Sequence, residues 1–172
     1  MLETDNIEIA LRAFRDKVIR EAKMNLRNRN KVSSGRLYKS IRGSKIRATN
    51  RSLQFNIEME DYGTFIDKGV SGVKRKFNTP YTYRDKMPPP SSLDNWIVRK
   101  GIAPRDEKGK FIKRKSLQFL IARGIYNNGI KPSLFFTTPF KKYAKSLPDI
   151  LEKAFALDTE ELLEYINKQN FK

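Results

Sequence analysis

The chain has 172 residues, a length that fits one domain with appendages and is too short for two independent cores. It carries 36 Lys and Arg against 19 Asp and Glu, a formal net charge of +17, so we expect an anionic partner: nucleic acid, an acidic protein or, least favoured, a membrane. The chain lacks Cys and His, which excludes disulfides, thiolate metal sites, serine triads and cysteine dyads, and we expect a protein that is not an enzyme and holds no cofactor.

Neither a signal peptide nor a membrane span is predicted. Residues 1–6 are acidic and polar, where a signal peptide needs a basic region followed by an apolar one. The longest apolar runs, such as 119–122 and 134–136, are far too short to cross a bilayer. We therefore expect the chain to stay in the cytosol and to bind no membrane.

A long amphipathic helix is predicted at the start of the chain. Apolar residues recur every three or four positions over 7–29, and Thr4 or Asp5 is placed to cap the first turn. The other faces of this helix carry mostly Lys and Arg. After a polar break, residues 35–41 predict a short helical turn.

Residues 53–59 give the clearest β signal. Apolar and polar side chains alternate there, which predicts a strand with one buried face and one wet face. Residues 44–49 are the expected partner strand, joined to it by a turn at 50–52.

A long basic loop is predicted over 68–90, where periodicity disappears and Gly and Pro accumulate. Three aromatic residues, Phe77, Tyr81 and Tyr83, are interleaved, so a simple flexible tether is less favoured. The basic residues of this loop are candidate contacts with DNA or with an acidic partner surface: Lys68, Lys74, Arg75, Lys76, Arg84 and Lys86.

A short helix is predicted next, from Ser92 to a stop at Gly101, with Ser91 and Asp94 placed as a capping box. Trp96, the sole tryptophan, has helical spacing with its apolar neighbours, which favours a core role over a ligand platform. An exposed turn follows at 105–110.

Two further helices and a buried segment complete the body. One helix is predicted over 116–127, with Leu117, Leu120 and Ile121 on its inner face and a stop at Gly129. Residues 134–136 read as a brief buried strand, and a helix is then expected from 138 to about 147.

The end of the chain is acidic where the body is basic. Pro148 is expected to interrupt the preceding helix, and Asp158 with Glu161 predicts a capping box that opens a final helical segment over 159–168. We therefore divide the chain into a domain over 1–148 and an acidic C-terminal helical extension over 149–172. We expect this extension to meet a basic surface of a neighbouring subunit or of an adjoining ring.

One acidic cluster, Glu58, Glu60, Asp61 and Asp67, raises the alternative of a metal-dependent nuclease. The alternation of residues 53–59 already explains the first two as solvated residues of a strand, and that interpretation is favoured. A glycine-rich phosphate loop is also missing, so a nucleotide-hydrolysing motor has no support.

Residues 62–70, Tyr-Gly-Thr-Phe-Ile-Asp-Lys-Gly-Val, resemble the Tyr-Ala-x-x-Val-Glu-x-Gly-Thr segment of head–tail joining and tail-completion proteins of lambda-like long-tailed phages. Three positions depart from that pattern: Gly63 stands in place of Ala, Asp67 in place of Glu, and Val70 in place of Thr.

Four other segments resemble the same family in the same order: 34–41, 89–102, 121–125 and 129–136. They cover a Thr-Gly-x-Leu-x-x-Ser-Ile pattern, a Pro-Pro stretch with Trp and Gly-Ile, a closing helix and an aromatic segment. The positions that carry the resemblance are Gly35, Leu37, Ser40, Ile41, Tyr62, Ile66, Asp67, Gly69, Trp96, Gly101, Phe135 and Phe136.

The resemblance implies an α+β fold, with a small, mostly antiparallel sheet packed by the long N-terminal helix, further short helices and the long basic loop. It implies a non-enzymatic virion protein, assembled in the cytoplasm of a bacterial host, that forms a ring of about six or about twelve copies in the head–tail connector. Its partners would be portal or adaptor proteins, tail proteins and the packaged DNA in the lumen. The alternatives are a free, sequence-nonspecific nucleic-acid-binding accessory protein and the metal nuclease.

Overall fold

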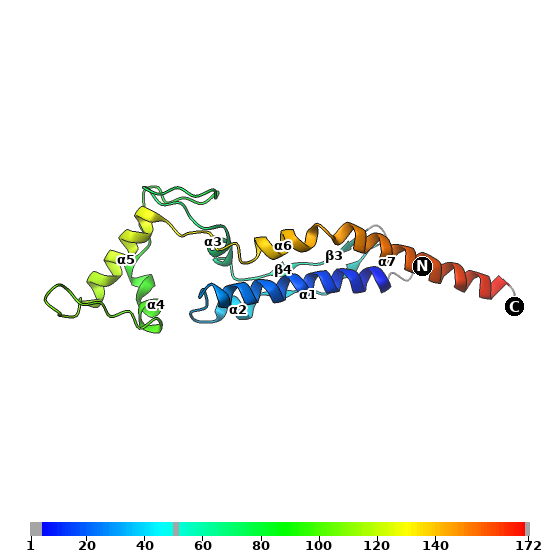
Figure 1. Ribbon diagram of the computed structural model, residues 1–172, viewed down its shortest axis with the longest axis horizontal. Coiled ribbons are helices and arrows are strands. Elements are labelled where there is room, and N and C mark those ends of the chain that lie inside the picture. The colour runs from blue at the N-terminus through cyan, green and yellow to red at the C-terminus, as the bar shows by residue number, and fades with distance from the viewer. Residues whose placement is uncertain (1–4, 50–51, 171–172) are drawn as a thin grey trace. The chain divides into compact units, whose positions relative to one another are not determined.

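The structure is a computed structural model that describes residues 5–49 and 52–170 (Figure 1). The fold is α+β, as predicted, with a long N-terminal helix packed against short antiparallel strands. The chain divides into two compact units. We call 5–25, 41–58 and 136–170 the helical unit, and 26–40 with 59–135 the loop-rich unit. None of the helices in the described residues is long and apolar enough to cross a membrane.

Helix α1 (Asp5–Asn28) confirms the predicted amphipathic helix. Its buried stripe recurs at intervals of three and four residues: Leu11, Phe14, Val18, Ala22 and Leu26. Of the two residues predicted to cap this helix, Thr4 lies outside the described residues and Asp5 belongs to the first turn.

The strands form an interrupted antiparallel hairpin. They pair as β1 (Arg42–Gly43) with β4 (Ile57–Glu58), and as β2 (Arg47–Ala48) with β3 (Leu53–Gln54). Between the pairs, the Ser44 hydroxyl accepts a hydrogen bond from the backbone N–H of Asn56 at 2.8 Å. In a regular antiparallel ladder a backbone carbonyl would be the acceptor. The predicted alternation of half-buried and exposed side chains is present throughout 53–59 even so. The predicted turn at 50–51 lies outside the described residues.

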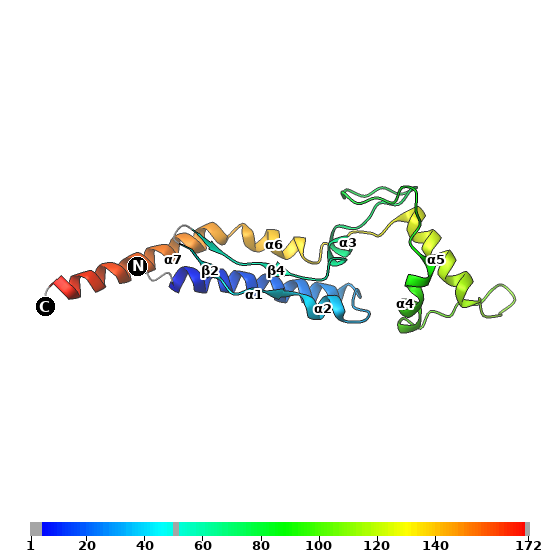
Figure 2. The same ribbon diagram turned by 180° about the vertical axis from the view of Figure 1, so that it is seen from behind.

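The core of the helical unit is built around Phe14. Its ring meets Phe55 of the hairpin edge-on at 6.2 Å and Phe140 of helix α6 (Thr137–Ala144) at 5.9 Å. The hairpin and α6 therefore both pack against the face of α1 that carries Phe14 (Figure 2). Aromatic pairs of this geometry stabilise a core beyond the area that they bury.

Helix α7 (Leu147–Asn170) follows after a short break, with Pro148 in its first turn. This helix is continuous, so the prediction of a separate segment opened by an Asp158–Glu161 capping box is wrong. Asp158 is instead buried, at 3% exposure, and its carboxylate accepts the backbone N–H groups of Asn6 at 2.9 Å and Ile7 at 3.2 Å. Those donors belong to the first turn of α1, where backbone N–H groups have no acceptor within the helix. Asp158 therefore caps α1 from a helix far away in the sequence.

The loop-rich unit consists of short helices joined by ordered loops. They are α2 (Arg36–Ser40), α3 (Gly63–Lys68), the 3₁₀-helix η1 (Pro90–Leu93), α4 (Asp94–Arg99) and α5 (Arg114–Asn128). Lys68 ends α3 and Pro90 begins η1, and the described residues between them form no helix, but backbone hydrogen bonds hold this basic loop in place. Ser71 bonds to Tyr81 and Tyr83, and Val73 and Lys74 bond to carbonyls at the end of α5.

Three local predictions for this unit are wrong. Ser91 and Asp94 form no capping box, because Asp94 accepts a hydrogen bond from Gln118 at 2.6 Å and thereby joins α4 to α5. Leu120 faces outward on α5, at 52% exposure. Residues 134–136 form no strand, since Leu134 has a positive φ of 50° and is half exposed, and of the three only Phe135 is buried.

Replacing Asp158 with Ala is expected to lower the free energy of unfolding by about 1–2 kcal/mol, because two N–H groups at the start of α1 lose their acceptor. Urea unfolding followed by far-UV circular dichroism measures this change. Glu160→Ala, at an exposed position of the same helix, is the matched control and should change stability by less than about 0.5 kcal/mol. Equal effects of the two substitutions would contradict the capping role.

Candidate functional site

A pocket of about 430 Å³ in the loop-rich unit collects residues from three separate stretches of the chain. We call it the motif pocket, and its lining is Leu26, Lys31, Val32, Ser33, Ser34, Gly35, Arg36, Leu37, Tyr38, Tyr62, Ile66, Asn95, Trp96 and Arg99. The end of α1 and the chain leading into α2 form one part of it, and α3 and α4 supply the rest. Its volume lies within the range of sites that bind drug-sized groups.

Five positions that carry the family resemblance line this pocket: Gly35, Leu37, Tyr62, Ile66 and Trp96. They come from three segments that the sequence separates by up to about sixty residues. Trp96 was expected in the core, but the structure places it half-buried in the pocket lining.

The remaining resemblance positions support the segments around the pocket or lie elsewhere. The Ser40 hydroxyl donates to the Leu37 carbonyl at 2.9 Å and accepts the Glu60 N–H at 3.0 Å, which ties α2 to the chain before α3. Ile41 is buried in the helical unit. Phe136, also in that unit, stacks on Phe140 at 5.9 Å.

A backbone clamp fixes helix α3 beneath the pocket. The carbonyl of Ile66 accepts both the N–H of Ser133 at 3.1 Å and its hydroxyl at 2.6 Å. The carbonyl of Asp67 accepts the N–H of Leu134 at 2.8 Å. Arg29 donates to the carbonyl of Ser133, so the chain after α1 joins the same arrangement. We call 66–70 and 130–134 together the backbone clamp.

Gly69 lies where the two sides of the clamp approach each other closely. Its φ is 74°, and a Cβ there would lie 2.5 Å from the Ile130 carbonyl oxygen and 2.7 Å from Pro132. Its neighbour Val70 exchanges two backbone hydrogen bonds with Ile130, at 2.9 and 2.8 Å. The position therefore requires glycine both for its backbone conformation and for space.

The electrostatics of the motif pocket are one-sided. Lys31, Arg36 and Arg99 line it, and none of the acidic residues that the structure describes does. Arg36 pairs with Glu60 outside the lining at 3.3 Å, and the Arg99 guanidinium donates to the Ser33 hydroxyl at 3.1 Å. The pocket thus combines an apolar lining with cations that are only partly neutralised.

A second, more open groove of about 640 Å³ adjoins the motif pocket through Tyr62 and Ile66, which line both. We call it the aromatic groove, and its lining is Tyr62, Phe65, Ile66, Val70, Pro80, Tyr81, Thr82, Tyr83, Arg84 and Ile130. The rings of Phe65 and Tyr81 meet edge-on at 4.7 Å. Burial raises the pKa of the Tyr83 hydroxyl above its ordinary value, because the charged phenolate would be poorly solvated there.

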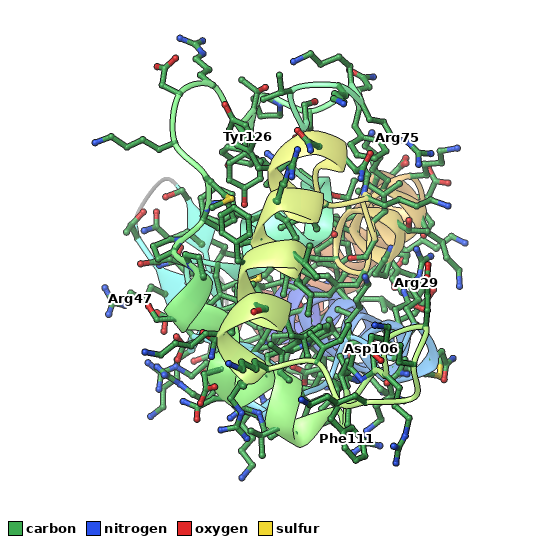
Figure 3. All side chains as sticks on the ribbon, turned by 90° about the vertical axis from the view of Figure 1, so that its left-hand side faces the viewer. Arg29, Arg47, Arg75, Asp106, Phe111 and Tyr126 are labelled. Atoms are coloured by element: carbon green, nitrogen blue, oxygen red, sulfur yellow. The ribbon has the colours of Figure 1, made fainter. Side chains whose placement is uncertain are left out.

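The six basic candidates of the loop are exposed, but the structure does not gather them into the motif pocket. Arg84 lines the aromatic groove, and its carbonyl accepts the Tyr126 hydroxyl at 2.6 Å. Arg75 stacks over the ring of Phe77 at 5.2 Å, and Lys76 donates to the Gly72 carbonyl at 2.9 Å. Arg75 and Tyr126 lie towards the same end of α5, where the loop passes (Figure 3).

The acidic cluster is dispersed. Glu58 pairs with Arg42 at 3.0 Å, Glu60 pairs with Arg36, and Asp67 is buried. Across 5–49 and 52–170, no group of three or more Asp and Glu residues is arranged to hold a metal ion.

Sequence reasoning missed the residues that give the pocket its charge and support. Lys31, Arg36 and Arg99 carry no local signal that separates them from the other basic residues. Ser133 was part of a resembling segment, but its role depends on two hydrogen bonds to a residue 67 positions away. Only the tertiary structure reveals these contacts.

No family model matches the chain, and no curated protein or solved structure is significantly similar to it. The family resemblance therefore stays a prediction based on the five segments.

Gly69→Ala is expected to destabilise the protein by several kcal/mol, because the new methyl group meets backbone atoms of the clamp. Gly101→Ala is a matched control, since Gly101 also has a positive φ of 62° but has no neighbour within 4 Å of a Cβ. It should cost only about 1–2 kcal/mol for the left-handed backbone. Thermal unfolding of both variants measures the difference, and equal losses would argue against the close approach.

Proposed function

We propose that the protein is a structural subunit of a bacteriophage particle that forms a ring at the head–tail junction and joins the portal to the tail around the DNA channel. The observation that carries this proposal is the meeting of three resemblance segments in one pocket with an apolar lining and a cationic rim. A pocket that combines apolar surface with positive charge has the chemistry to bind an acidic protein surface.

Exposed apolar side chains support an assembled state. Both units expose large side chains to solvent: Phe111, Phe119, Leu120, Phe155, Leu157, Leu163 and Tyr165. Groups of apolar side chains on a surface often mark contacts between proteins. In a closed ring, each subunit would cover such side chains against its neighbours.

The charge of the chain supports a position beside DNA. A net charge of +17 makes copies of the chain repel one another unless anions lie close by. Lys74, Arg75 and Lys76 of the basic loop are exposed and consecutive. Phosphates in a channel would neutralise such residues without any reading of sequence.

The same exposed basic residues favour a second candidate, a free accessory protein that binds nucleic acid without sequence preference. The two functions differ in what assembles first. An accessory protein binds duplex DNA tightly as a monomer, whereas a ring subunit associates with itself or with its neck partners.

We expect the purified protein to form closed rings, alone or with the products of neighbouring genes, and to be present in purified virions. Sedimentation velocity, negative-stain images and mass spectrometry of virions test these expectations. A protein that stays monomeric under both conditions and is missing from virions would refute the proposal.

Replacing Lys74, Arg75 and Lys76 with Gln is expected to weaken binding to duplex DNA and to make its salt dependence shallower. The slope of log K against log salt should fall by up to about 3, since each phosphate contact contributes about 0.9. Fluorescence anisotropy over a salt series measures the slope. Lys108, Lys110 and Lys113→Gln removes equal charge from other exposed positions and serves as the control. A flat salt dependence in the intact protein would remove the electrostatic basis of DNA contact.

A further inference from the structure

We propose that the C-terminal part of α7, residues 155–169, binds in the motif pocket of a second copy of the chain. This inference depends on the self-association in the proposed function, and it names the two surfaces that meet. We call residues 155–169 the α7 terminal segment.

The α7 terminal segment presents an apolar side that is about half exposed to solvent. Ala154, just before this segment, and Asp158, within it, are buried in the helical unit. Beyond them α7 runs on past the beginning of α1 (Figure 1). Phe155, Leu163 and Ile166 are 56%, 55% and 42% exposed, and their spacing of eight and three residues places them on one side of the helix.

The same segment is acidic. Glu160, Glu161 and Glu164 lie in it, and Lys168 is its only basic residue. The Glu164–Lys168 pair at 3.3 Å is about three-quarters exposed on both sides, so it binds weakly and can be given up. An acidic, apolar helix end thus stands out in a chain of net charge +17.

The motif pocket has the complementary chemistry. Leu26, Leu37 and Trp96 supply apolar lining, and Lys31 and Arg99 supply charge, with no acidic residue in the lining. Amphipathic helices bind other proteins by inserting apolar side chains spaced over successive turns into such concave surfaces. Opposite charges around the contact set the orientation and raise the rate of association.

The contact would join two different surfaces, the α7 terminal segment of one copy and the motif pocket of another. Each copy would insert its helix end into the next copy and receive the helix end of the previous copy. Contacts of this type close into a ring when the rotation between copies permits it. The inferred contact therefore produces the kind of assembly that the proposed function requires.

A charge-reversal experiment tests the pairing on the full-length chain. Glu160→Lys with Glu164→Lys, and separately Lys31→Glu with Arg99→Glu, should each weaken self-association about tenfold or more. Mixing the two variants should restore association, because the helix end made basic in one variant can then bind the pocket made acidic in the other. Sedimentation velocity of each variant and of the mixture measures this.

Trp96 gives a second readout, since it is the only tryptophan and lines the motif pocket. Its emission should shift as the intact chain is concentrated into the associated range, and the shift should vanish in either double variant. Asp85→Lys with Glu107→Lys, and Lys108→Glu with Lys110→Glu, change the charge equally at exposed positions outside the pocket and should leave both readouts unchanged.

Three outcomes would overturn the inference: association that survives both reversals, reversed variants that fail to pair when mixed, or control variants that weaken association equally. A Trp96 shift that depends on Glu160 and Glu164 in a strictly monomeric protein would also overturn it, because the contact would then lie within one chain. Rings that form regardless of these residues leave the proposed function standing without this contact. Restored pairing of a protein that virions lack would support the contact and refute the function.

Discussion

The pocket depends on the backbone clamp between 66–70 and 130–134. Ile66 and Asp67 offer their carbonyls to Ser133 and Leu134, and Val70 and Ile130 exchange two hydrogen bonds. The part of the chain between these two segments contains the basic loop, α4 and α5. Buried backbone groups must be paired, and the clamp pairs them without a regular sheet. Gly69 permits this approach, since a side chain there would collide with Ile130 and Pro132 on the other side of the clamp.

Helix-scale periodicity and alternation were predictable from the sequence, because both depend on local geometry. The stripe of α1, the two-residue alternation over 53–59, and the stops at Gly101 and Gly129 all follow from spacing and backbone freedom. The contacts of charged side chains with residues far away in the sequence were not predictable. Asp158 has the local pattern of a helix cap, and it does cap a helix, but a different one.

The misplaced residues share a physical cause. Leu120 has the spacing of an inner-face residue, yet the side of α5 that is buried is the one that carries Leu117 and Ala122. Leu134 belongs to an apolar run that reads as a strand, yet the clamp bends the chain there into a left-handed conformation. In both cases a tertiary contact decided which apolar residues were buried. The site residues Lys31 and Arg99 were hidden for the related reason that surface charges look alike along a sequence.

The capping of α1 by Asp158 has a consequence for biosynthesis. The two partners are separated by 152 positions, so α1 lacks this cap during synthesis until residue 158 has also left the ribosome. Contacts of such long sequence separation form late and slow the final folding step. The helical unit of a nascent chain therefore stays incomplete until α7 has been synthesised. Completion of the fold is delayed until the acidic end of the chain is available.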